Sequence, residues 1–317
     1  MNKIIDLRSD TVTLPTEEML QSILNAKLGD DVYQEDETVN ELQSLASEMM
    51  GKEDALLVTS GTQGNLVSLM AQTNHGDEVI LEQEAHIYYY EVGGLSAVAG
   101  LVPRLIKGIR GYIPPEELEK ALRPKNIHYP PTTLLCIENT HNRAGGTVIT
   151  PKQMKALADV AWSHNLKIHL DGARIFNAAV ALDKDVKEFT KYVDSVMFCL
   201  SKGLAAPIGS LVVGSSEFIE KARKIRKMLG GGMRQTGIIA APGIVALKTM
   251  IPRLKEDHEN AKILAHALVK HEEFKIDLET VQTNIIFGHF VSKNLDAYQL
   301  AKELQKYGIE ELSIEER

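Results

Sequence analysis

The chain has 317 residues, enough for one large domain with a sizeable core and a second, smaller one. Its 44% hydrophobic and 25% charged residues are typical of a globular protein, and its net charge of −8 argues against nucleic acid or an anionic membrane as a main partner. The N-terminal residues lack the apolar core of a signal peptide, and no apolar run approaches the about 20 residues that span a bilayer. Cys136 and Cys199 lie in apolar runs, so we expect buried free thiols, no metal cluster and a cytoplasmic location.

Short apolar runs alternate with amphipathic helices along most of the chain. The runs expected to form strands are residues 56–60, 78–81, 133–138, 166–171, 195–200 and 210–214. Thr150 and Pro151 are typical of the cap and the first residue of a helix between the third and fourth of these strands. Its apolar face would consist of Met154, Leu157, Ala158, Ala161 and Trp162. A strand, a helix and another strand in succession predict an α/β fold with a mostly parallel sheet.

The pattern changes near residues 250–253, which precede a long charged helix over about residues 254–270. A strand over 281–290 and a helix over 295–307 are expected to follow. We therefore predict a large domain over residues 1–250 and a smaller C-terminal domain over 251–317.

Polar residues follow the ends of three predicted strands. Ser60, Gly61 and Thr62 lie between the first strand and a helical run, where hydroxyls and backbone N–H groups favour an anion such as phosphate. Asp171 and Lys202 each end an apolar run and are each followed by glycine. Because open α/β sheets build their sites at the carboxyl edge of the strands, we expect these side chains to meet there.

This combination matches the needs of a single cofactor. A partly desolvated lysine can form a Schiff base, an aspartate can pair with a cationic ring nitrogen, and a helix N-terminus can hold a phosphate. Each feature alone is more often structural, as a solvated lysine, a turn aspartate or an ordinary helix cap. Together they predict an enzyme that uses pyridoxal 5′-phosphate.

Seven segments of the chain, taken together, resemble the threonine aldolase family. They are residues 4–13, 29–33, 86–94, 138–142, 169–174, 201–203 and 230–235. The resemblance implies the aspartate aminotransferase-like architecture called fold type I, with a large α/β domain and a smaller C-terminal α+β domain. It also implies cleavage of L-threonine or L-allo-threonine to glycine and acetaldehyde.

The resemblance further implies roles for individual residues. Lys202 would bind the cofactor covalently, Asp171 would keep its ring nitrogen protonated, and Ser60, Gly61 and Thr62 would hold its phosphate.

Two more residues would act at the cofactor ring. Arg174 would contact the cofactor and the substrate carboxylate, because a guanidinium binds a carboxylate through two hydrogen bonds. His86 would stack on the ring and exchange protons near neutral pH. Without the resemblance, Arg174 could equally be a member of a surface ion pair, and His86 a structural histidine.

Four residues match less specific parts of the family pattern. Ser9 would lie near the substrate carboxylate, although it can also cap a turn. His128 would lie near the substrate side chain, with a structural loop histidine as the alternative, and Tyr33 would form a wall of the site. Arg234, after three glycines, would reach the phosphate bound by a neighbouring subunit. The active site would then lie at the interface of a homo-oligomer, commonly a dimer of dimers.

The chain departs from the family pattern in two places. Gln34 replaces a glycine that is usual there. After the helix predicted over 295–307, the family has a strand that carries an arginine and then a closing helix, whereas this sequence has only residues 308–317. Arg317 lacks the flanking apolar residues and is not given that role. We therefore expect weakened substrate binding and a less stable C-terminal domain, unless a partner subunit covers the gap.

The main reading is a lyase that acts on a small amino acid, and three alternatives stay open. One is a related β-eliminating lyase with the same cofactor. Another is a cofactor-binding protein with impaired catalysis, and the third is a doubly wound nucleotide-binding domain. The catalytic base is also open between His86, His128 and a bound water.

Overall fold

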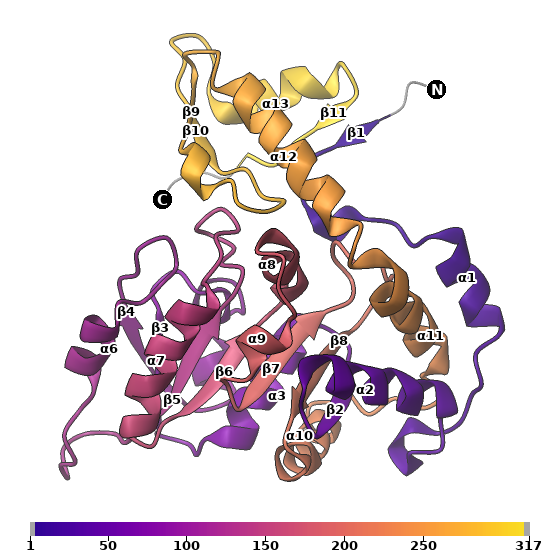
Figure 1. Cartoon of the computed structure of the whole chain (residues 1–317), viewed down its shortest axis with the longest axis vertical. Coiled ribbons are helices and arrows are strands. Elements are labelled where there is room, and N and C mark those ends of the chain that lie inside the picture. Colours follow the sequence, from indigo (N-terminus) through magenta and orange to yellow (C-terminus); the bar gives the residue numbers. More distant parts are fainter. Residues whose placement is uncertain (1–3, 314–317) are drawn as a thin grey trace.

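A seven-stranded sheet forms the centre of the protein in the computed structural model, which describes residues 4–313 (Figure 1). Across the sheet the strands are β2 (Asp54–Val58), β8 (Ser210–Gly214), β7 (Ser195–Cys199), β6 (Lys167–Asp171), β5 (Thr132–Glu138), β3 (Glu78–Glu82) and β4 (Val102–Ile106). The strand β8 runs antiparallel to β2 and β7, and every other neighbouring pair in this sheet is parallel. The mostly parallel α/β sheet is therefore confirmed, although the sequence analysis missed β4.

Helices cover both faces of the sheet, which explains why its strands are continuous apolar runs. In β7, Val196 and Phe198 face one core layer, whereas Met197 and Cys199 face the other. The layer beside Met197 is built by α3 (Gly61–Gln72), α5 (Gly94–Ala97) and α10 (Ser216–Met228). The opposite layer contains α1 (Glu17–Leu24), α2 (Glu37–Met50), α6 (Pro115–Ala121), α7 (Pro151–Ser163), α8 (Ile175–Ala181), α9 (Lys187–Thr190) and α11 (Gly237–Val245).

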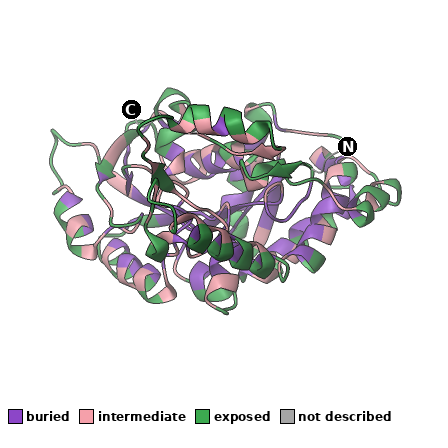
Figure 2. Cartoon of the chain, turned by 90° about the horizontal axis from the view of Figure 1, so that it is seen from above, coloured by how far each residue is buried: buried purple, intermediate pink, exposed green. Residues whose placement is uncertain are grey.

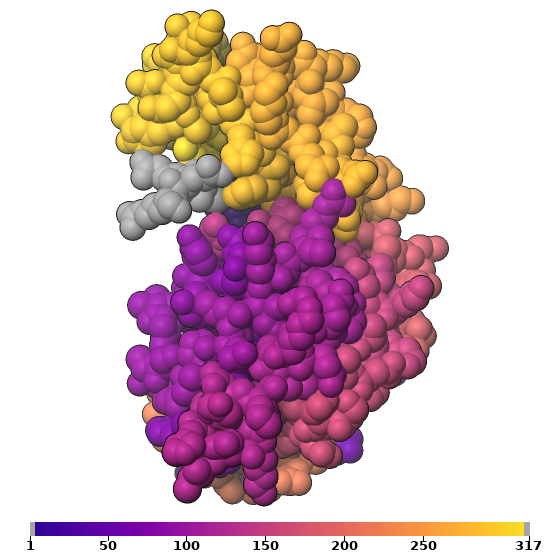
Figure 3. Space-filling view, turned by 90° about the vertical axis from the view of Figure 1, so that its left-hand side faces the viewer, coloured from indigo at the N-terminus to yellow at the C-terminus, as the bar shows by residue number. Residues whose placement is uncertain are grey.

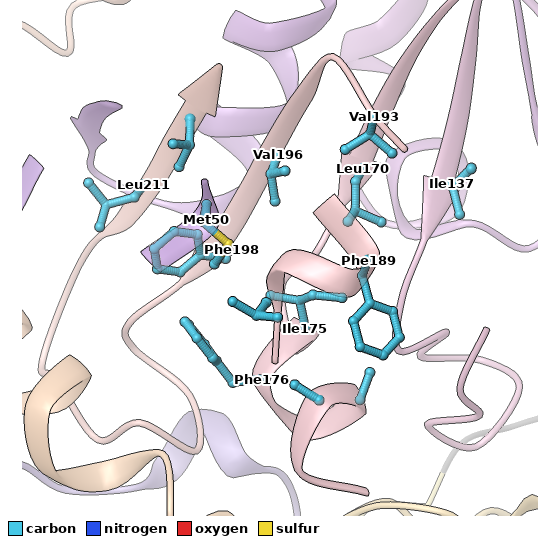
Figure 4. Close-up of a cluster of buried hydrophobic side chains, with 14 of the residues drawn as sticks. Met50, Ile137, Leu170, Ile175, Phe176, Phe189, Val193, Val196, Phe198 and Leu211 are labelled. Atoms are coloured by element: carbon cyan, nitrogen blue, oxygen red, sulfur yellow. The ribbon is translucent and has the colours of Figure 1, made fainter. Parts of the chain in front are cut away.

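The core beneath α8 fixes the start of that helix (Figure 4). Ile175 and Phe176 are both buried, and the ring of Phe176 lies 5.5 Å from that of Phe198 at an interplanar angle of 87°. An edge-to-face contact of this kind adds to the stabilisation that comes from burial alone. Because Arg174 directly precedes these anchors, the core also holds Arg174 at the edge of the sheet.

The predicted helix after Thr150 is present as α7, with a complete capping box in which Thr150 and Gln153 bond each other's backbone N–H. Its apolar face is narrower than expected. Met154, Leu157, Ala158 and Ala161 are buried, but Trp162 is 47% exposed, so its assignment to the core was wrong. Both cysteines are buried and free, as expected.

The C-terminal residues form a separate lobe above the large sheet (Figures 1 and 3). It contains α12 (Leu254–Leu268), α13 (Ala297–Gln305) and an antiparallel pair, β9 (Phe274–Ile276) and β10 (Gly288–Phe290). The N-terminal strand β1 (Ile5–Asp6) joins this lobe by pairing in parallel with β11 (Ile309–Glu310). Viewed from above, buried residues gather in the large sheet and its helices, and much of this lobe is exposed (Figure 2).

The predicted strand over residues 281–290 is wrong except for β10. Residues 281–287 instead contact the large sheet's loops: the Thr283 hydroxyl donates to the Gly146 carbonyl at 2.7 Å, and Val148 N–H donates to the Gln282 side chain at 2.8 Å. These polar contacts replace the ladder bonds that a strand would make. The change of pattern near residue 250 is a π-helical turn, η3 (Ala246–Met250), between α11 and α12.

Among the described residues, no single helix is long and apolar enough to cross a membrane. The helical stretches 237–250 and 254–268, bent by 66°, pass that test only as a pair.

Gln34 has a left-handed backbone, with φ 59° and ψ 32°, at the end of the 3₁₀ turn η2 (Asp31–Tyr33). A side chain in this region costs about 1 kcal/mol, a cost that glycine avoids. We therefore expect Gln34→Gly to raise the free energy of unfolding by up to about 1 kcal/mol in urea titrations. Glu35→Gly, at the next exposed position, should lower it because it only adds chain entropy to the unfolded state. Equal effects of the two variants would contradict this account.

Candidate active site

Six strands bring their carboxyl ends to one edge of the sheet. Because β8 is antiparallel to both β2 and β7, the strand β2 runs in the same direction as β7, β6, β5, β3 and β4. Ser60 therefore follows the end of β2, Lys202 the end of β7, and Asp171 ends β6 at a common edge. Glu138 ends β5 there as well. The topology therefore brings the ends of β2, β6 and β7 to one edge of the sheet, as predicted.

The N-terminus of α3 forms an anion-binding position beside β7. Ser60 is its cap and accepts a hydrogen bond from Gln63 N–H at 3.2 Å. A Cβ built on Gly61 would lie 3.0 Å from the sulfur of Cys199, so glycine lets the helix approach the end of β7 closely. The N–H groups of Gly61 and Thr62 belong to the first turn, whose donors have no partner within a helix. Together with the helix dipole they suit a phosphate.

Asp171 is a buried carboxylate, 2% exposed, held by two donors. Its Oδ1 accepts from Ala173 N–H at 3.1 Å, and its Oδ2 accepts from the side-chain amide of Asn65 at 2.9 Å. The same amide nitrogen donates to Glu91 Oε1 at 2.8 Å. Sequence reasoning missed Asn65, although its position one helical turn after Gly61 places it below the phosphate position.

His86 begins the short helix α4 (His86–Tyr89) and is half-buried. Its Nδ1 lies 3.0 Å from Glu91 Oε1, and its backbone N–H donates to Glu138 Oε2 at 2.7 Å. Burial lowers the pKa of His86, but the Glu91 hydrogen bond and the charge of Asp171 outweigh it, so that pKa lies above its ordinary value. Burial and the nearby Asp171 raise the pKa of Glu91.

Ligand atoms of His86, Glu91 and Asp171 lie within 4.8 Å of one another, a spacing that could hold a metal ion. The amide of Asn65, however, already donates to both carboxylates. Each of the two carboxylates therefore already accepts a hydrogen bond from within the protein.

The guanidinium of Arg174 is held by an ion pair within the protein, and its expected contact with a substrate carboxylate stays a prediction. Its Nε and Nη2 donate to Asp10 at 2.7 and 2.6 Å, and Nη1 donates to Asn142 at 3.2 Å. Both charged side chains are only 8% exposed, and a buried guanidinium needs such a counter-charge. Burial raises the pKa of Asp10, but Arg174 and Lys202 outweigh it and hold that pKa below its usual value.

Asp10 also connects three parts of the chain. It lies in the N-terminal segment, pairs with Arg174 at the start of α8, and accepts a hydrogen bond from Asn284 of the C-terminal lobe at 3.0 Å. A Cβ atom added to Gly203, the residue after Lys202, would lie 3.9 Å from the Oδ2 atom of Asp10. The neighbouring Ser9 caps the 3₁₀ turn η1 (Asp10–Val12) through Thr11 N–H at 3.2 Å. Ser9 thus has the capping contact that was its alternative interpretation, close to the predicted site.

Within a single chain, three predicted site residues make no described contact with the cluster around Asp171. His128 lies exposed in the loop before β5, at the opposite edge of the sheet from Asp171. Within a single chain, His128 therefore does not have its expected position near the substrate. Tyr33 is 71% exposed. Arg234 pairs with Asp30 at 2.9 Å on the surface, where 55% of its side chain is exposed. Arg317 lies outside the described residues.

The residues present fit pyridoxal 5′-phosphate. The edge offers an anion position at α3, a buried carboxylate whose two donors leave lone pairs for a cationic ring nitrogen, and the amine of Lys202, a half-buried residue. These are the three kinds of contact that the cofactor requires.

Comparison with known proteins places this geometry in a family context. The beta-eliminating lyase family model matches residues 6–290. Low-specificity L-threonine aldolase 1 of Arabidopsis thaliana is 45% identical over 310 residues, which are 96% of this chain and 87% of the relative. Low specificity L-threonine aldolase of Escherichia coli K12 is 45% identical, over 93% of this chain and 87% of the relative. The solved structure of Leishmania major threonine aldolase has a TM-score of 0.83 at 19% identity, covering 99% of this chain and 90% of that one.

The ion pair of Asp10 and Arg174 should be important for stability. Removing one partner of a buried pair leaves the other charge uncompensated, so we expect Asp10→Asn to lower the free energy of unfolding by about 3 kcal/mol. Urea unfolding measures this change. Arg8→Gln removes the exposed pair with Asp6 and serves as the control, with an expected change under about 1 kcal/mol. Similar losses in both variants would contradict a larger contribution of the buried ion pair to the free energy of unfolding.

Proposed function

The chain belongs to the beta-eliminating lyase family, and from this premise we propose that it is a pyridoxal phosphate-dependent threonine aldolase. It cleaves L-threonine or L-allo-threonine to glycine and acetaldehyde. The observation that carries the proposal is the buried Asp171 carboxylate, which shares one sheet edge with Lys202 and the anion position of α3. The threonine aldolases among its relatives support the reaction.

Each part of the site has a separate task in holding the cofactor. When bound, pyridoxal phosphate supplies a carbonyl carbon for a Schiff base and a ring that accepts the electrons of a breaking bond. Ser60, Gly61 and Thr62 bind the phosphate, and Lys202 supplies the amine. Asp171 holds a proton on the ring nitrogen, because an ionised carboxylate stabilises the cationic form of a neighbouring base.

The remaining residues orient the substrate and move a proton. Ser9 and the Nη1 group of Arg174 bind the substrate carboxylate, while Asp10 keeps the guanidinium in place. A carboxylate only accepts hydrogen bonds, so the hydrogen between His86 and Glu91 belongs to His86 Nδ1. This leaves Nε2 of His86 to accept the proton of the substrate hydroxyl, and we assign it the role of general base.

Acetaldehyde release from the four stereoisomers of threonine tests the function. We expect release from the L and L-allo forms, with glycine as the second product. Lys202→Ala should lower turnover by several orders of magnitude because covalent catalysis requires its amine. Lys221→Ala, a change at an exposed helix position, should leave turnover intact. A keto acid and ammonia as products would instead identify a β-eliminating lyase.

The pH dependence of kcat/KM tests the role of His86. A base must be unprotonated, and the pKa of His86 is raised above 6.5 by Glu91 and Asp171 despite its burial. Activity should therefore be lost as pH falls through a value above 6.5. Glu91→Gln removes a negative charge that stabilises the protonated imidazole, so the inflection should move to lower pH. An inflection that stays in place or moves to higher pH would exclude His86 as the base.

We also propose a homo-oligomer, a dimer of dimers, located in the cytoplasm. Exposed apolar side chains on the N-terminal segment support an interface there, namely Leu14 at 81%, Leu24 at 78% and Tyr33 at 71% exposure. Arg234 reaches the same region through its pair with Asp30, so a second copy docked there would bring Arg234 near another site. Buried free cysteines are in keeping with a reducing compartment.

A further inference from the structure

We propose that Asn65 is a positioning residue that holds Asp171 and Glu91 together, and that His169, Ser195 and Gln72 fix the orientation of its amide. The inference deepens the proposed function, because it concerns the residues that support the cofactor's ring nitrogen and its base. It rests on a chain of hydrogen bonds buried between α3 and the sheet.

The hydrogen-bond chain begins at Gln72 and ends at the carboxylates of the active site. The side-chain amide of Gln72 lies 2.8 Å from Ser195 Oγ, and Ser195 Oγ lies 2.8 Å from His169 Nδ1. The other ring nitrogen of His169, Nε2, lies 3.1 Å from Asn65 Oδ1. Asn65 Nδ2 then contacts both Asp171 and Glu91 at 2.9 and 2.8 Å.

The donors and acceptors in this hydrogen-bond chain have one consistent assignment. Two carboxylates can only accept, so both amide hydrogens of Asn65 are used and its Oδ1 must accept from His169. His169 is fully buried, and burial lowers its pKa to about 4, so the ring is neutral and carries a single N–H, at Nε2. Its Nδ1 therefore accepts from the Ser195 hydroxyl, whose oxygen accepts from Gln72.

The fold brings these residues together through simple periodicities. Asn65 and Gln72 are seven residues apart on one face of α3, and His169 and Asp171 are two apart on one face of β6. Ser195 is the direct neighbour of His169 in the β6–β7 pairing. Their neighbours along the strands, Ile168, Leu170 and Val196, belong to the core layer on the opposite face of the sheet.

The orientation of the Asn65 amide decides whether two negative charges can stay close. With its nitrogen toward them, one amide donates to both carboxylates and holds them at a fixed spacing. A flipped amide would direct its oxygen at both of them. Because Glu91 also holds Nδ1 of His86, one amide links the partner of the cofactor's ring nitrogen to the partner of the base.

Two alanine variants on neighbouring strands separate this role from a general effect of burial. Ser195→Ala removes the donor that fixes the tautomer of His169. Ser210→Ala removes a hydroxyl on β8 that is also buried but has no hydrogen-bond partner. Both variants lose one oxygen atom from the core, but only Ser195 belongs to the hydrogen-bond chain. Asn65→Leu removes the amide itself at similar volume.

The readouts are the affinity for pyridoxal phosphate and the pH midpoint of the bound cofactor's visible absorbance. Asn65→Leu should weaken binding about ten-fold or more, since it removes hydrogen bonds to charged groups. Ser195→Ala should shift the absorbance midpoint, and Ser195→Thr, which keeps the hydroxyl, should restore it even if the added methyl group lowers the melting temperature. Ser210→Ala should match the wild-type protein in both readouts.

Either of two results would overturn the inference: a Ser195→Ala midpoint equal to wild type, or equal shifts in Ser195→Ala and Ser210→Ala. These measurements require cofactor binding but no cleavage of threonine. A wild-type protein that binds the cofactor without cleaving threonine would therefore contradict the proposed substrate and still allow the hydrogen-bond chain to be judged. A wild-type protein that binds no cofactor would contradict both.

Discussion

The buried carboxylate of Asp171 determines how the rest of the site is built. A negative charge that is 2% exposed requires hydrogen bonds and a nearby positive charge to offset its desolvation. Asn65 and Ala173 supply the hydrogen bonds within the protein. A cationic ring nitrogen would supply the charge, and the cofactor's phosphate and aldehyde would then meet α3 and Lys202. The parallel strands matter because they deliver these groups to one edge.

A second buried charge joins this site to the C-terminal lobe. Asp10 binds Arg174 at the start of α8 and Asn284 on the lobe, and β1 in the same N-terminal segment pairs with β11. Relative movement of the lobe would therefore disturb the guanidinium that faces the substrate. The N-terminal segment thus links substrate binding to the packing of residues far away in the sequence.

Residues in regular elements could be predicted from the sequence, and those placed by tertiary contacts could not. Short apolar runs that end at a polar or charged residue followed by glycine were enough to place Ser60, Asp171 and Lys202 at one edge. The pairing of Asp10 with Arg174 was missed, because their contact depends on how an irregular N-terminal segment crosses the sheet. Residues 281–287 were misassigned because their apolar pattern suits a strand while their polar side chains bond the large sheet's loops. Asn65 was visible as a polar residue in a buried helix, but its partners on β6 were not.

The central claim is that Lys202 is the amine that holds the cofactor at this edge. Borohydride reduction of the protein loaded with pyridoxal phosphate fixes the Schiff base covalently, and peptide mapping by mass spectrometry then identifies the modified lysine. We expect one pyridoxyl group per chain, on Lys202. A stoichiometric adduct on any other lysine, or a loaded protein that reduction leaves unmodified, would contradict it.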